Sequence, residues 1–311
     1  MGRRYSLILL LVIFLVGCRP ASPTPTATSA ILTPTKLQAT PTNASPNSAK
    51  DAALLRNANY QLGNSVTLAD IVQLKDGKFE RGAPGDANYA SVQLTAFVAS
   101  GELDTDHANN EITALFAENY GGSGVFVYLT AFANENGTPT FITSTLVDDR
   151  PQLNSLSIKN NRILLDSIIH STDDPMCCPT MRVTRQYRFV DDQLDMTNYA
   201  TFTPDGKPRT IMIAAPADRT EVFNSIHVQG KVAVAPFENN LTYSIKDGTG
   251  VELSRGVVPV TAANPGGAGT FDATISLGSI LSNTVIFLEI QDISAADGTL
   301  LAMDSVELVV K

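Results

Sequence analysis

Short β-prone runs follow one another so closely from about residue 58 onward that no helices fit between them. Parallel strands need crossover connections of a dozen or more residues, so these runs predict antiparallel pairing. Residues that tolerate positive φ separate several of the runs: Asp76-Gly77, Gly121-Gly122, Glu135-Asn136-Gly137 and Asn160-Asn161. Helical periodicity is confined to a short stretch at Lys50–Asn57. The predicted fold class is therefore mainly all-β.

The first folded region, 51–203, is expected to be an antiparallel β-sheet domain. Its strands are expected near Val66–Leu74, Ala90–Ala99, Glu111–Ala117, Val125–Phe132, Thr140–Leu146, Leu153–Lys159, Arg162–His170 and Met181–Val190. Breakers are concentrated at Pro204-Asp205-Gly206-Lys207-Pro208, which predicts a domain boundary there.

The second folded region, 209–311, has the pattern of an immunoglobulin-like β-sandwich, because about 100 residues hold seven short strands. These strands are expected near Thr210–Ala215, Ser225–Ala235, Leu241–Asp247, Glu252–Pro259, Gly269–Leu277, Thr284–Asp292 and Ser305–Val310. The Cys…Trp…Cys set of antibody domains is missing. Gly230 and Gly269 are expected to allow a bulge or a close strand approach, Asp297-Gly298 a turn, and Phe237 a place in the core.

The second region also resembles the immunoglobulin-like domain associated with bacterial spore germination proteins. The segments that carry the resemblance are Ile211–Pro216, Val228–Ala233, Pro236–Leu241, Asp247–Gly250, Gly269–Phe271 and Glu289–Gly298. The resemblance implies a surface-associated β-sandwich attached to other extracytoplasmic modules, with no catalytic residues. The first region resembles secreted bacterial proteins through Gly121–Gly124 and Asp174–Pro179, and that resemblance implies no function.

The N-terminus indicates export. Arg3 and Arg4 precede an apolar run of ten residues, Leu7–Val16, which is too short for a spanning helix of about 20 residues and suits a signal peptide at 1–17. The ending Leu15-Val16-Gly17-Cys18 resembles the lipobox of bacterial lipoproteins. That resemblance implies that Cys18 becomes the mature N-terminus and carries a diacylglycerol thioether and an N-acyl chain such as palmitate. Ordinary secretion with a bystander Cys18 is the alternative.

Between this cysteine and the folded regions lies a linker, 18–50, rich in Pro, Thr, Ser and Ala. Such a segment has too little apolar surface to offset the entropy of ordering, so we expect a disordered tether. The protein is thus expected to be extracytoplasmic and attached to the cell membrane by its N-terminal lipid.

Charge excludes one class of partner. All 31 acidic residues lie at or beyond Asp51 and five of the 22 basic residues precede it, so the folded part carries 17 basic against 31 acidic residues. Nucleic-acid binding relies on clustered Lys and Arg, and we therefore expect no nucleic-acid partner.

Cys177-Cys178 is the most unusual local feature of the sequence. In an oxidising compartment, with Cys18 lipidated, the two thiols are left to each other, and the flanking Pro175 and Pro179 already restrict the backbone. This favours a vicinal disulfide. Free thiols, a metal site completed by His170 or Asp174, and a redox switch remain alternatives.

An oxygen-rich cluster is a weaker calcium candidate, formed by Asp104, Asp106, Asn109 and Glu111. Ca²⁺ takes six to eight oxygens from a sharply bent loop, but the expected glycine is missing here. A solvated acidic hairpin loop is the alternative.

The function predicted from these features is that of a non-catalytic, lipid-anchored accessory or binding protein that presents β modules to a cell-wall or protein partner. No cofactor is expected. Gly121-Gly122-Ser123-Gly124 matches neither a P-loop nor a nucleophile turn. The enzyme alternative is a wall-active or redox enzyme centred on Asp173–Cys178, with His170 as the base. A purely structural stalk module is a third possibility.

Overall fold

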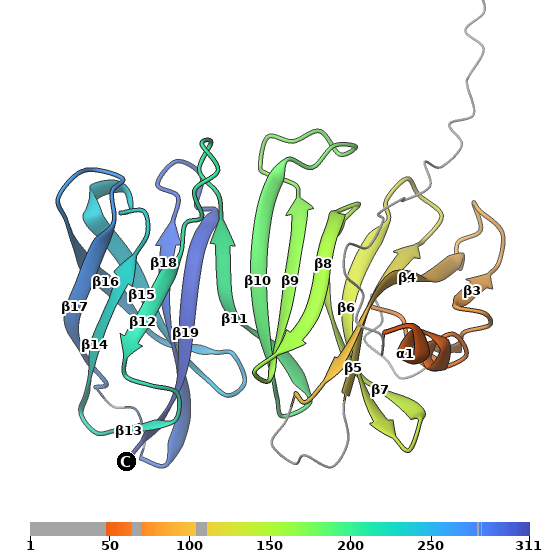
Figure 1. The fold of residues 1–311 in the computed structure, drawn as a ribbon, viewed down its shortest axis with the longest axis horizontal. Coiled ribbons are helices and arrows are strands. Elements are labelled where there is room, and N and C mark those ends of the chain that lie inside the picture. The colour runs from red at the N-terminus through yellow and green to blue at the C-terminus, as the bar shows by residue number, and fades with distance from the viewer. Residues whose placement is uncertain (1–47, 64–69, 104–110, 279, 281) are drawn as a thin grey trace, which may run out of the picture. The chain divides into compact units, whose positions relative to one another are not determined.

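A computed structural model describes residues 48–63, 70–103, 111–278, 280 and 282–311 (Figure 1). These residues form antiparallel β-sheets with one α-helix, α1 (Ser48–Leu55), which confirms the predicted fold class. They all lie within one compact unit, Ala39–Lys311. No helix in the described ranges is long and apolar enough to cross a membrane. The signal peptide, Cys18 and the linker up to residue 47 lie outside the described residues.

A five-stranded sheet in the order β3-β4-β5-β6-β7 forms the first layer. Its strands are β3 (Lys78–Arg81), β4 (Ala90–Gly101), β5 (Glu111–Asn119), β6 (Phe126–Glu135) and β7 (Thr138–Asp149). One face packs against α1 and the small sheet formed by β1 (Asn59–Gln61) and β2 (Ile71–Gln73), through buried residues such as Tyr60, Phe116 and Phe132. The other face carries Leu115 and Leu129 into a second core. Both faces of β5 are therefore buried.

The second layer is a meander of β8 (Gln152–Lys159), β9 (Arg162–Ile169), β10 (Met181–Val190) and β11 (Gln193–Thr201). Ile163, Leu165 and Tyr187 from this layer complete the second core. Its tight turns use pairs of positive-φ residues, as two-residue hairpin loops do: the expected Asn160-Asn161 and also Asp191-Asp192. The second turn and the β11 that follows it were not predicted.

The C-terminal region is a β-sandwich in which all seven predicted strands are present. They are β12 (Ile211–Ala215), β14 (Ser225–Val232), β15 (Asn240–Asp247), β16 (Glu252–Ala262), β17 (Gly269–Ser276), β18 (Thr284–Ile293) and β19 (Leu300–Val310). β16 belongs to both sheets, since it pairs with β15 up to Pro259 and with β17 over Val260–Ala262. Aliphatic side chains such as Ile226, Val258 and Leu288 fill the space between the sheets.

Phe237 corrects one expectation, because its side chain is 74% exposed rather than in the core. The residues after it, Glu238 and Asn239, have φ values of 59° and 54°, so the chain turns away before β15 begins. Ala235 and Leu241, on either side of the turn, pack into the sandwich core in its place. The predicted turn at Asp297-Gly298 is confirmed by φ of 76° at Gly298.

The strand pairing continues across the predicted boundary at 204–208. β11 pairs with β19 over Asn198↔Asp304, Tyr199↔Met303 and Ala200↔Ala302, so β8–β11 and half of the sandwich form one sheet (Figure 1). Further along the same edge of β19, the short β13 (Thr220–Val222) pairs in parallel with Leu308–Val310. The backbone of Glu307, between these two stretches, bonds to Asp218 and Arg219.

Arg188 of β10 lies where β11 and β13 meet the edge of β19. Its side chain is 3% exposed and donates two hydrogen bonds, of 2.9 and 2.8 Å, to the carboxylate of Asp195. The same guanidinium lies 3.6 Å from Glu307 and stacks 4.2 Å above the ring of Phe287. One buried cation therefore joins the meander to two strands of the sandwich.

Gly230 allows β12, β14 and β17 to approach closely, as expected. A Cβ at this position would overlap the Phe271 ring and the carbonyl oxygen of Met212. The β12–β14 register shifts between Ile213 and Ala215, opposite this glycine. Gly269 is similar, because its Cβ would lie 2.7 Å from the side chain of Val260.

Replacement of Arg188 by alanine is expected to lower the free energy of unfolding by about 1.5–3 kcal/mol, since it removes charge-assisted hydrogen bonds to Asp195 and the contact with Phe287. Urea unfolding followed by circular dichroism measures this loss. The matched control is Arg255→Ala, because the Arg255 side chain is 53% exposed in its pair with Glu252. That loss should stay below about 1 kcal/mol. Equal losses in the two variants would contradict the role assigned to Arg188.

Gly230→Ala is expected to destabilise the protein by about 1–3 kcal/mol, because the added methyl group must displace the Phe271 ring or strand β12. Gly248→Ala serves as the control, since a Cβ at Gly248 has nothing within 4 Å. The shift in the midpoint of urea unfolding measures the loss of stability in both variants. A control variant as unstable as Gly230→Ala would mean that the close approach does not cause the loss.

Candidate functional site

Three loops, which come from both folded regions, lie at the same end of one sheet. The sheet runs β18-β19-β11-β10-β9, and alternate strands of an antiparallel sheet end on the same side. The loops that follow β9, β11 and β18 therefore lie together, along the upper edge of the view in Figure 1. We call them the loop surface, which consists of residues 170–180, 202–210 and 294–299.

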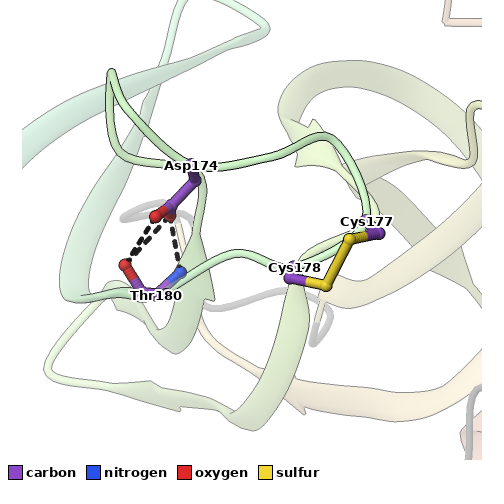
Figure 2. Close-up of a disulfide and its surroundings, with 4 residues drawn as sticks. All are labelled: Asp174, Cys177, Cys178 and Thr180. Carbon is purple, nitrogen blue, oxygen red and sulfur yellow. Dashed lines mark hydrogen bonds between the residues drawn. A yellow bond between two sulfur atoms is a disulfide. The ribbon is translucent and has the colours of Figure 1, made fainter.

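Asp174 closes the base of the 170–180 loop. Its carboxylate accepts a hydrogen bond from the backbone N–H of Ser171 at 2.8 Å. It also accepts hydrogen bonds from the Thr180 N–H at 2.7 Å and the Thr180 hydroxyl at 2.8 Å (Figure 2). The Ser171 N–H, with the Thr180 donors, lowers the pKa of Asp174 from 3.8 to about 2, because each bond favours the charged form. These contacts, which we call the Asp174 clamp, join the two ends of the loop.

The tip of this loop, residues 175–178, carries the two cysteines. The N–H of Cys178 donates to the Pro175 carbonyl at 2.9 Å, which makes a β-turn with Met176 and Cys177 at its centre. The Sγ atoms of Cys177 and Cys178 face each other (Figure 2), while the two Cα atoms are 3.8 Å apart, as across a trans peptide bond. Both cysteines are exposed, and Met176 is 62% exposed. The vicinal disulfide stays a prediction.

The other two loops also contain aspartates that accept hydrogen bonds from neighbouring loop residues. In the 202–210 loop the Thr203 hydroxyl donates to Asp205 and lowers its pKa. In the 294–299 loop Asp297 accepts from the Ser294 hydroxyl and from the Thr299 N–H at 3.1 Å, and these bonds hold the pKa of Asp297 far below its usual range. Each loop of the surface is therefore organised by its own carboxylate.

Hydrogen bonds also connect the loops to one another. The Thr172 hydroxyl lies 3.0 Å from a carboxylate oxygen of Asp297 and 3.2 Å from the Thr299 hydroxyl, which links the meander to the sandwich. Arg209, in the second loop, forms an ion pair with Asp292 of β18 at 3.6 Å. Burial raises the pKa of Asp292, and the nearby Arg209 opposes that rise. The 170–180 loop of the meander is thus bonded to the 294–299 loop of the sandwich, and the 202–210 loop is paired with β18.

The contacts of His170 do not match the role of catalytic base that the enzyme alternative assigns to it. Its Nδ1 lies 3.1 Å from the carboxylate of Asp148 in β7, and its backbone N–H donates to the same oxygen at 2.7 Å. Its Nε2 is buried without a hydrogen-bond partner. The predicted Cys–His arrangement is therefore not brought together by these contacts.

The calcium candidate falls largely outside the described residues, which leave out Asp104, Asp106 and Asn109. Glu111 is described: it is 4% exposed and accepts the N–H of Leu103 at 2.7 Å. Among the residues that the structure does describe, no three His, Cys, Asp or Glu side chains are grouped to hold a metal ion. Calcium binding at these four residues stays a prediction, as does lipidation of Cys18.

A buried carboxylate elsewhere was missed at the level of sequence. Glu118 of β5 is 1% exposed and accepts from the hydroxyls of Tyr60 and Tyr120 and from the N–H of Gly63 at 3.0 Å. Burial raises its pKa, and these hydrogen bonds oppose the rise. The sequence pattern of β5 does not distinguish this buried glutamate from a solvent-exposed one. These bonds join β1 and Gly63 to the first sheet.

Comparison with known proteins identifies only the C-terminal region. No curated protein matches the chain in sequence. Residues 210–299 match the family model described as the immunoglobulin-like domain of bacterial spore germination (Gmad2). The match starts one residue before β12 and ends at residue 299, the last residue before β19, and the sheets observed there are those of a sandwich. The C-terminal region of this chain therefore carries an immunoglobulin-like domain similar to that of bacterial spore germination proteins, a type of module that is generally not enzymatic.

Proposed function

We propose that this protein is a non-catalytic accessory or binding protein on the outside of a bacterial cell, anchored through acyl chains on Cys18. Its loop surface is the region that contacts a cell-wall or protein partner. The observation that carries the proposal is the organisation of that surface, in which loops from both folded regions are bonded to one another. The family match of residues 210–299 supports the non-catalytic part.

Preorganised loops on a rigid scaffold suit binding, because less conformational entropy is lost when a partner docks. The Asp174 clamp and the aspartates of the other two loops provide this preorganisation. The exposed side chain of Met176 provides apolar contact area at the tip. No observation favours the enzyme alternative at Asp173–Cys178 over binding.

The anchor explains how such a surface is presented. Two or three acyl chains hold a protein durably in a membrane, whereas one chain binds only marginally. The Pro- and Thr-rich linker between Cys18 and residue 50 spaces the folded regions from the bilayer. The acidic balance of those regions disfavours contact with an anionic lipid surface. The loop surface is thus left to meet other envelope components.

Cys18→Ser is expected to release the protein from the membrane, because no thioether can form on the serine hydroxyl. Fractionation of cells into membrane and soluble material, with mass spectrometry of the N-terminus, measures the change. The wild-type chain should begin at an acylated Cys18, with residues 1–17 removed. Cys177→Ser leaves the anchor intact and should stay in the membrane fraction. A wild-type chain recovered with Met1 still present would refute the anchor.

A photo-crosslinking amino acid in place of Met176 is expected to trap the partner in intact cells. The matched control is the same substitution at Val257, which is also 62% exposed but lies on β16 away from the loop surface. Adducts to one envelope protein or to peptidoglycan at position 176, and not at 257, are the expected result. Equal labelling at both positions would mean that the loop surface is not the contact region.

A further inference from the structure

Two separate constraints hold the 170–180 loop, and they act on different parts of it. The Asp174 clamp joins residues 171 and 180 at the base through three hydrogen bonds. The paired sulfur atoms act only on the tip, because Cys177 and Cys178 are neighbours in the chain and enclose no other residue (Figure 2). A change at the sulfur atoms therefore leaves the base untouched.

The tip is accessible to a reductant whereas the base is tied to the rest of the fold. Cys177 and Cys178 are exposed, as are Pro175 and Met176 on their N-terminal side. Pro179 is buried, and Thr172 is hydrogen-bonded to Asp297 of the sandwich. A thiolate can thus approach either sulfur without any strand having to separate.

We propose that Cys177 and Cys178 form a reducible disulfide that sets the conformation of the tip, so that the loop surface binds its partner only in the oxidised state. This inference rests on the function proposed above. The oxidised pair fixes the turn that presents Met176. Reduction frees the side-chain torsions of both cysteines, and the turn then depends on the single hydrogen bond from Cys178 to Pro175.

The reductant is a dithiol, such as the reduced form of an extracytoplasmic thiol–disulfide exchange protein. One of its thiolates attacks a sulfur of the pair, the sulfur–sulfur bond breaks, and the other cysteine leaves as a thiolate that takes up a proton. The second thiol of the reductant then attacks the mixed disulfide. The products are two cysteine thiols on this chain and one disulfide in the reductant, so two electrons and two protons have been transferred.

Hydrogen exchange of the full acylated chain in detergent, with and without excess dithiothreitol, tests the local effect. The amide of Cys178 is expected to exchange at least about tenfold faster after reduction, while the amides of Ser171 and Thr180 keep their rates. The thermal midpoint should change by less than about 2 °C, since no strand contact is lost. Iodoacetamide treatment of a parallel sample should add two carbamidomethyl groups only after reduction.

Two variants distinguish the constraint on the tip of the loop from the constraint on its base. In Asp174→Asn the Thr180 amide should exchange faster even when the pair is oxidised, because the clamp is weakened. In the double variant Cys177→Ser with Cys178→Ser, the amide of residue 178 should exchange at the rate of the reduced wild-type chain. Dithiothreitol should not change that rate. Iodoacetamide labelling without reduction, an unchanged rate at Cys178, or a large drop in thermal midpoint would each overturn the proposal.

The cross-linker at position 176 distinguishes failure of this inference from failure of the proposed function. Adducts that form on irradiation of untreated cells, but not of cells reduced briefly with dithiothreitol beforehand, support redox control. Adducts that still form in cells reduced before irradiation overturn the redox control and leave the binding function in place. Absence of adducts in both states counts against the binding function, whereas the exchange rates at Cys178 still report whether the tip responds to reduction.

Discussion

The edge of strand β19 is the place on which the rest of the structure depends. An unpaired strand edge exposes a row of N–H and C=O groups that can pair with another chain. Here β11 pairs with Ala302–Asp304, β13 pairs with Leu308–Val310, and Asp218 and Arg219 bond to the backbone of Glu307 between them. The chain therefore covers this edge with its own residues, and in doing so it makes one sheet of two folded regions.

That continuity also places the candidate site. Because β9, β11 and β18 belong to one sheet and run in the same direction, the loops that follow them share one end. The hydrogen bond between Thr172 and Asp297 joins residues 125 positions apart in the chain. Such a bond forms only if the register between β11 and β19 is fixed. The buried guanidinium of Arg188, close to Glu307 and Phe287, stabilises the same junction.

The sandwich could be predicted from the sequence because its strands alternate clearly and its turns carry glycine, as at Asp297-Gly298. β11 could not, because the turn before it is Asp191-Asp192 and polar residues interrupt the alternation of the strand. A two-residue turn of aspartates with φ of 48° and 59° has no glycine to signal it. Phe237 was placed in the core because aromatic residues are usually buried, and the two positive-φ residues after it expose it instead.

The candidate site was predictable in its chemistry but not in its geometry. Adjacent cysteines between Pro175 and Pro179 are visible in the sequence, but nothing in the sequence indicates that Asp174 closes the loop. Its partner Thr180 carries no signal of its own, because threonine occurs throughout this chain, in strands as well as in loops. The family match ends at residue 299, just before β19 begins, and Thr172 lies outside it altogether. The features shared with the matched family therefore describe the sandwich and its 294–299 loop, whereas the loop surface also depends on β9–β11, which the family model does not cover.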